Sequence, residues 1–210
     1  MRRGWQRIGL VGREALALLR ERGLRAAWRT IRRRAFDWSK SLLFVRVPRE
    51  GDGEGPWSEE WEFLVYEPGQ RTACLCVLEA LGVSDELGNF DRGAVCVVAR
   101  DASGTPVGSG WDFGYSRLLE RLSYPSDAIY LGGFLVPESR RGQGIYPALL
   151  RYMVTRRGGE RLAVAQTSLH NLGSQRGLEK AGFVCRGRLC LGILAGVIVI
   201  FRMDGASDRM

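Results

Sequence analysis

The chain has 210 residues, of which 45% are apolar and 26% are charged, as in a globular domain with room for an appendage. Its net charge of +8 comes from the first quarter, because residues 1–50 hold 14 Lys and Arg against 4 Asp and Glu, whereas the remainder holds 17 against 19. No Cys/His metal site is expected, since His170 is the only histidine and the five cysteines lie in apolar runs without paired CxxC motifs, which also favours a reduced, cytoplasmic protein.

The first quarter of the chain combines helical spacing with many arginines. Apolar residues recur at helical intervals over residues 5–36, which predicts a helix in two pieces. The segment 41–47 then has the composition of a strand, and the acidic, Gly-rich segment 48–62 is typical of a surface loop. We therefore divide the chain into a basic helical extension, residues 1–40, and a main domain, residues 41–210.

The main domain begins with a strand near 63–67 and an amphipathic helix over 69–82. Two alternating runs around "DASGTP" predict an antiparallel hairpin over 94–113. A short helix is predicted over 117–122, and a strand over 128–136 that ends before Pro137.

The C-terminal half alternates between helices and strands. Helices are predicted over 144–157 and 171–182, with a strand over 161–169 between them. The apolar run Leu189–Phe201 is too short to span a bilayer as a helix, and it is interpreted as part of two terminal strands. Because helices follow a hairpin, we expect an α/β fold with a mixed sheet.

One loop carries a chemical signal. The segment "ESRRGQGIYPALL" (138–150) follows a predicted strand and opens a predicted helix. Gly142 and Gly144 would let the unpaired amides at the start of the helix approach an anion, and Arg140 or Arg141 would add positive charge. The alternative is a Gly-rich turn with solvated arginines. The loop lacks both the Gly-Lys-Ser/Thr of a Walker A motif and the third glycine of a dinucleotide fingerprint.

A second segment, residues 171–183, follows one predicted strand later and bears on the interpretation of this loop. Residues Asn171–Ser174 and "EKAGF" (179–183), together with "FLVPESRRGQGIYPALL", resemble the GNAT superfamily of acyl-CoA-dependent N-acyltransferases. The resemblance covers residues 94–203 well, 41–93 loosely and 1–40 not at all. It implies a GNAT-like mixed, mostly antiparallel central sheet flanked by helices.

The resemblance also implies which residues bind the co-substrate, acyl-CoA carrying an acetyl or longer acyl group, with no metal. They come from a strand end that polarises the thioester, from the diphosphate loop and from the helix beside the pantetheine arm. These residues are Phe134, Leu135, Val136, Arg141, Gly142, Gln143, Gly144, Ile145, Tyr146, Asn171 and Ser174.

Two positions depart from the family pattern. Tyr146 stands where the loop motif has Gly or Ala, and Leu178 stands where many relatives place a general-acid tyrosine. The expected activity is acyl transfer from acyl-CoA to a primary amine by direct attack. The alternative is a catalytically degenerate protein that binds acyl-CoA as a sensor or scaffold.

A protonated amine must lose a proton before it attacks, so a base is needed. Two residues are candidates for catalysis. Tyr130 takes the strand position where some relatives hold a carboxylate, and a phenol is a poor base at neutral pH but can donate to the leaving thiolate. His170 lies between a predicted strand and Asn171, where an imidazole could act as the base or simply be exposed. Asp127 and Glu138 are weaker candidates.

The role of residues 1–40 stays open at this point. The segment could pack as an extra helical layer, or contact an anionic membrane through tryptophans and arginines. Nucleic acid or an acidic partner would also suit its charge, although we do not expect nucleic acid. The protein could then be cytoplasmic and membrane-peripheral. Neither the acceptor amine nor the oligomeric state is indicated by the sequence.

Overall fold

The structure, a computed structural model, describes residues 36–48, 60–156, 161–194 and 197–205. The helix predicted over residues 5–36 lies outside these residues except at Phe36, as does most of the loop predicted at 48–62. The possible membrane contact of the extension also falls on residues that are not described. The chain divides into two compact units, one of Leu43–Arg186 and one of Met1–Leu42 with Gly187–Met210.

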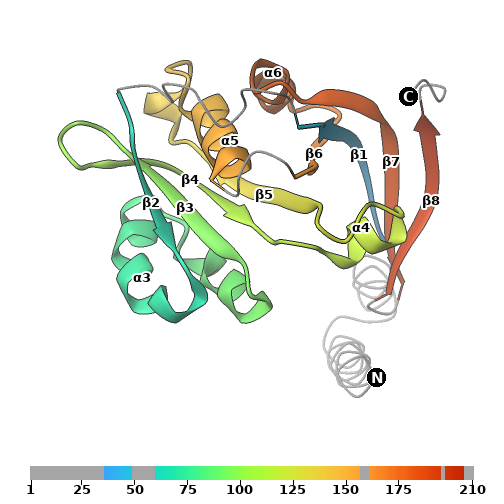
Figure 1. The fold of residues 1–210 in the computed structure, drawn as a ribbon, viewed down its shortest axis with the longest axis horizontal. Helices are drawn as coiled ribbons and strands as arrows, with labels where there is room; N and C mark the ends of the chain where they lie inside the picture. The colour runs from blue at the N-terminus through green and yellow to red at the C-terminus, as the bar shows by residue number, and fades with distance from the viewer. Residues whose placement is uncertain (1–35, 49–59, 157–160, 195–196, 206–210) are drawn as a thin grey trace, which may run out of the picture. The chain divides into compact units, whose positions relative to one another are not determined.

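Five complete strands of the larger unit pair with one another in a mixed sheet (Figure 1). Its strand order is β2-β3-β4-β5-β6, with antiparallel pairing from β2 to β5 and parallel pairing between β5 and β6. The predicted mixed, mostly antiparallel sheet is therefore confirmed. The strands are β2 (Glu62–Tyr66), β3 (Val95–Arg100), β4 (Pro106–Asp112), β5 (Ile129–Leu135) and β6 (Ala163–Ser168).

The predicted helices of this unit are confirmed to within two residues at each end. One 3-10 helix, η2, was not predicted, because its sequence "SDELGNFDR" lacks a sustained apolar period and ends at Gly93 in the left-handed region. The helical elements are η1 (Pro68–Gln70), α3 (Arg71–Ala80), η2 (Ser84–Arg92), α4 (Arg117–Arg121), η3 (Glu138–Arg140), α5 (Ile145–Thr155) and α6 (Leu172–Lys180).

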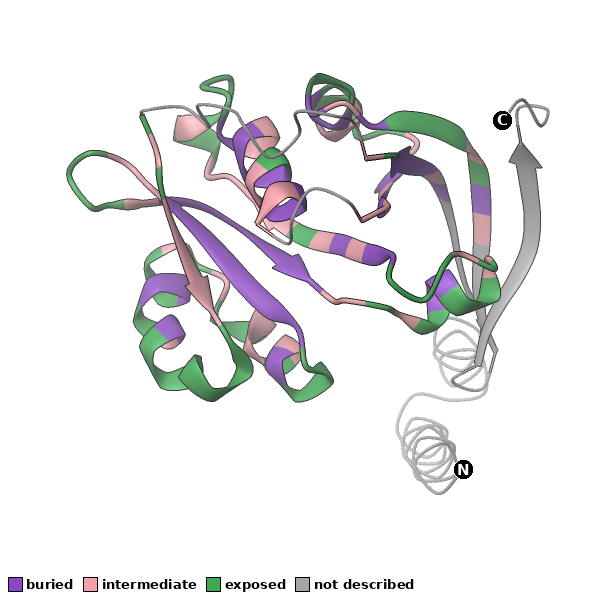
Figure 2. Ribbon diagram, in the orientation of Figure 1, coloured by how far each residue is buried: buried purple, intermediate pink, exposed green. Residues whose placement is uncertain are grey.

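Both faces of the central strands are covered. β3 and β4 are buried along almost their whole length (Figure 2). On one face Trp111 of β4 packs in a core cluster with α3 residues such as Leu78 and with Phe90 of η2. On the other face Gly108 leaves room for Ile145 of α5, since a Cβ there would lie 3.0 Å from the Ile145 Cγ2. Successive residues of β4 therefore serve opposite layers, as strand geometry requires.

The strand β1 (Phe36–Arg46) starts five residues earlier than predicted. The prediction that residues 36–40 belong to the helical extension is therefore wrong. The alternation Phe36-Asp-Trp38-Ser has the period of a strand, and aromatic residues favour that conformation. At the C-terminal end, β7 (Val184–Leu194) and β8 (Val197–Gly205) form an antiparallel hairpin, which confirms the two terminal strands. In the described part of the chain, no helix has the length and hydropathy needed to cross a bilayer.

Candidate functional site

The site begins where two parallel strands stop pairing. β5 and β6 are in register over three residue pairs, from Ile129 with Ala163 to Leu131 with Ala165. Pairing ends there, although β5 continues to Leu135 and β6 to Ser168. The edge of β5 that faces β6 is therefore open beyond Leu131, and a ligand can lie against its backbone.

Glycines shape the open end of β5. Gly133 has φ +60°, and a Cβ there would lie 2.7 Å from the Cδ1 of Trp111, so a larger residue would be both strained and crowded. The indole of Trp111 donates to Glu86 Oε2 at 2.5 Å, and burial raises the pKa of the Glu86 carboxyl. On the other face of the sheet, the ring of Phe134 occupies the space that a Cβ of Gly110 would take.

Five consecutive backbone amides, those of residues 142–146, donate to no acceptor in the described part of the chain. They precede and open α5, whose N-cap Gly144 provides no side-chain cap. The next residue, Pro147, has no amide hydrogen. Gly142 and Gly144 have φ +84° and +81°, a left-handed conformation that glycine adopts without strain. The head of α5 therefore presents uncapped donors, as in known anion sites.

A partly buried ion pair fixes the entry to this loop. Arg140 Nη2 donates to Asp101 Oδ2 at 2.9 Å, which ties the loop to the turn between β3 and β4. Hydrogen bonds from the Ser103 hydroxyl and from two backbone amides lower the pKa of Asp101, with Arg140 contributing. Arg141 is more exposed, and its pair with Glu138 is looser at 3.6 Å. Arg140 thus positions the loop, whereas Arg141 can turn to a ligand.

A cleft of about 720 Å³ lies between the loop, the open end of β5 and the start of α6. Four cationic side chains line it, and its described lining includes no carboxylate. The lining residues are Phe134, Leu135, Val136, Arg140, Arg141, Gly142, Gly144, Ile145, Tyr146, Pro147, His170, Asn171, Leu172, Gly173, Ser174, Arg176, Gly177 and Lys180. All the predicted coenzyme-binding residues except Gln143 are thus brought together in one cationic cleft.

The unusual Tyr146 bridges the two helices of the cleft. Its hydroxyl is 3.0 Å from the Ser174 Oγ of α6, and its ring meets the Phe134 ring edge to face at 5.0 Å. Gly177 makes this possible, because a Cβ there would overlap the Tyr146 ring. Burial raises the pKa of Tyr146 to about 12, so the phenol stays protonated.

Asn171 caps the helix α6 as well as lining the cleft. Its side-chain oxygen accepts from the backbone amide of Ser174 at 3.0 Å and caps α6. Gln175 donates to the carbonyls of Ser168 and Leu169 and holds the turn before the helix. The turn therefore presents Asn171 and Ser174 to the cleft in a fixed arrangement.

The two predicted catalytic residues lie in different surroundings. His170 is exposed and lines the cleft. Tyr130 lies outside the cleft lining, with its ring centroid 5.8 Å from that of Phe113. Burial raises the pKa of Tyr130 to about 12, so its phenol is protonated near neutral pH. Asp127 and Glu138 do not line the cleft either.

Several cleft residues were missed from the sequence. Leu172, Arg176 and Lys180 project from α6, and only their spacing of four residues from one another could have indicated a common face. Gln143 lies in a smaller neighbouring pocket. Leu178, at the position of the missing tyrosine, is fully buried. Among the described residues no group of three or more His, Cys, Asp or Glu side chains could hold a metal ion.

Solved structures resemble this chain in their fold. One is an acetyltransferase of the GNAT family from Colwellia psychrerythraea, with a TM-score of 0.50 and 18% identity over 73% of this chain. The fold is that of the GNAT family. The earlier resemblance is thereby confirmed at the level of the fold.

A second solved structure with a similar fold is of a protein of unknown function. It is a functionally unknown conserved protein from Staphylococcus epidermidis, with a TM-score of 0.50 and 18% identity over 77% of this chain. The chain spans 55% and 64% of the length of these two solved proteins. Neither a protein-family model nor a curated protein matches the sequence.

Proposed function

We propose that the chain is an acyl-CoA-dependent N-acyltransferase that moves an acyl group, acetyl or longer, to a primary amine. The observation that carries the proposal is the row of unbonded amides at residues 142–146, which opens into a cationic cleft beside an unpaired strand edge. A diphosphate fits such a row, because each amide can donate to a phosphate oxygen in a charge-assisted hydrogen bond. The GNAT-like fold supports acyl transfer in general.

The chain's own residues divide the binding task. The amides of residues 142–146 and the side chain of Arg141 hold the diphosphate. The cleft between β5 and α6 receives the pantetheine arm, with Asn171 and Ser174 on one side and the open edge of Phe134–Val136 on the other. Main-chain amides at this edge polarise the thioester carbonyl. The acyl-CoA supplies the activated carbonyl and the thiolate leaving group.

Transfer then requires one proton to leave the amine and one to reach the sulfur. The amine nitrogen forms a bond to the carbonyl carbon, the carbon–sulfur bond breaks, and its electron pair stays on sulfur. His170, which lines the cleft, takes the proton of the amine directly or through water. Tyr130 stays protonated and lies outside the cleft lining, so we assign the proton that reaches the sulfur to solvent in the cleft.

Turnover of acetyl-CoA by the full chain tests the proposal. Free thiol is measured with a panel of small amines, amino sugars and lysine peptides, and thiol release that depends on an amine is expected. His170→Gln should lower kcat by about 100-fold if the imidazole is the base. Binding of acetyl-CoA without thiol release over the whole panel would instead support the sensor or scaffold alternative.

Mass spectrometry of the purified protein identifies the natural donor. A co-purifying CoA thioester would report the acyl chain length directly, and its absence from a preparation that turns over acetyl-CoA would indicate weak retention of the donor. No binding of CoA in any form would contradict the proposal.

A further inference from the structure

The side chain of Tyr146 departs from the loop pattern of the family and has no part in the proposed acyl transfer. Tyr146 is the second residue of α5 and lines the cleft. Its ring takes a space that glycine leaves open on α6, because a Cβ at Gly177 would overlap the ring. The Phe134 ring meets it edge to face from the open end of β5. Packing on both sides therefore fixes the ring, and with it the position of the hydroxyl.

The Tyr146 hydroxyl is paired with the hydroxyl of Ser174 near the start of α6, with 3.0 Å between the two oxygens. A phenol is more acidic than an aliphatic alcohol, so the phenol is the stronger donor and the alcohol the better acceptor. Burial raises the pKa of Tyr146 to about 12, which keeps its hydrogen in place near neutral pH. The bond is therefore donated by Tyr146 and accepted by Ser174.

This direction leaves the hydrogen of the Ser174 hydroxyl unused. A serine hydroxyl carries one donor and two acceptor lone pairs, so accepting a bond does not occupy its donor. In the described part of the chain, the Ser174 hydroxyl has no hydrogen-bond partner other than Tyr146. Ser174 is half-buried and lines the cleft. The cleft wall thus holds an oriented hydrogen-bond donor that the protein itself does not use.

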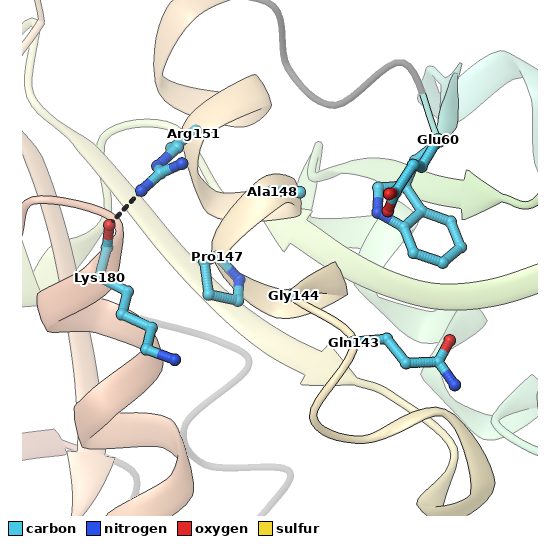
Figure 3. Close-up of a pocket in the computed structure, with 8 residues that line it drawn as sticks. Glu60, Gln143, Gly144, Pro147, Ala148, Arg151 and Lys180 are labelled. Carbon is cyan, nitrogen blue, oxygen red and sulfur yellow. Dashed lines mark hydrogen bonds between the residues drawn. The ribbon is translucent and has the colours of Figure 1, made fainter.

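A separate bond joins the far ends of the same two helices. The Arg151 guanidinium of α5 donates to the backbone carbonyl of Lys180, the last residue of α6 (Figure 3). This bond and the fit of the Tyr146 ring against Gly177 do not involve the phenol hydroxyl. Loss of that hydroxyl alone should therefore leave α5 packed on α6 and change only the orientation of Ser174.

We propose that Tyr146 is a positioning residue that orients the Ser174 hydroxyl to donate to an amide carbonyl of the pantetheine arm, an inference that rests on the proposed function. Without a bond from Tyr146, a helical serine hydroxyl turns back to a carbonyl of the preceding turn of its own helix. The bond from Tyr146 competes with that arrangement. A glycine or alanine at position 146 has no hydroxyl and could not do this.

Calorimetry with CoA and ADP tests this role in the full chain. Both ligands carry a diphosphate, but ADP lacks the pantetheine arm. Tyr146→Phe keeps the ring and the backbone amide, so the affinity for ADP should stay the same. The affinity for CoA should fall by about 3- to 10-fold, as expected for the loss of one neutral hydrogen bond.

A double-mutant cycle assigns the effect to the pair of hydroxyls. Ser174→Ala should weaken CoA binding by the same factor as Tyr146→Phe, and the double variant should lose no more than either single variant. Tyr152→Phe is the matched control, because it removes a phenol hydroxyl from the same helix outside the cleft lining. It should change neither affinity.

The outcomes separate this inference from the function on which it rests. An unchanged CoA affinity in Tyr146→Phe, additive losses in the double variant, or equal losses for CoA and ADP would overturn the positioning role and leave the acyltransferase proposal intact. Failure of wild type to bind CoA would overturn both.

Discussion

Replacing the loop glycines with alanine tests the geometry of the proposed anion site. Gly142 and Gly144 have φ +84° and +81°, and a Cβ at either position would meet nothing within 4 Å. Packing therefore does not oppose alanine, and only backbone strain acts. A non-glycine residue in the left-handed region costs about 1–2 kcal/mol, so the double variant carries about 2–4 kcal/mol of strain.

The loop can relieve this strain by leaving the left-handed conformation, which turns its amides away from their common target. Each charge-assisted hydrogen bond contributes about 1.5–3 kcal/mol, so loss of two of them would cost about 3–6 kcal/mol of binding free energy. This corresponds to an increase of about 100-fold or more in the Kd for CoA. The core strands do not depend on the loop, so the fold should persist.

Calorimetric titration of CoA into the Gly142→Ala, Gly144→Ala variant measures this loss. Gly93→Ala is the matched control, because Gly93 has φ +74°, is equally open and ends η2 outside the cleft. The control should lose about 1–2 kcal/mol of stability and keep its affinity for CoA. A folded double variant with the wild-type Kd would refute the assignment of the loop.

Two further substitutions test the packing around the site. Gly177→Ala should lower the unfolding free energy by about 1–3 kcal/mol, because the new methyl group overpacks against Tyr146, although alanine normally favours a helix; a higher Tm would contradict this. Glu86→Gln keeps an acceptor for the indole of Trp111. Because burial raises the pKa of Glu86, wild-type stability should fall as pH rises through the range between its ordinary and raised pKa values, and the variant should lack this fall. Parallel urea titrations of both proteins from pH 4 to pH 8 check the difference, and identical pH profiles would rule it out.

The elements that were predicted well are those in which apolar residues recur at the regular spacing of a strand or a helix. The hairpin of β3 and β4 alternates cleanly around Asp101, and α5 repeats apolar residues at helical intervals. The start of β1 was missed because the preceding helical period continued as far as Phe36. η2 was missed because its residues favour a turn and gain order from packing Phe90 against Trp111.

The site was predictable where it depends on local backbone chemistry. Glycines at the head of a helix indicate exposed amides without any knowledge of tertiary structure. The fit of Tyr146 against Gly177 was not predictable, because the two residues are 31 positions apart and meet only when α5 packs on α6. The cations at Arg176 and Lys180 were missed for the same reason, since their direction depends on how α6 lies over the cleft.

The central claim is that the amides of residues 142–146 hold the diphosphate of the coenzyme. Titration of CoA into ¹⁵N-labelled protein, followed through the backbone amide resonances, tests it most directly. We predict large shifts for the amides of Gly142, Gln143, Gly144, Ile145 and Tyr146, with smaller ones along β5. Binding that leaves these five resonances in place while others shift would contradict the account.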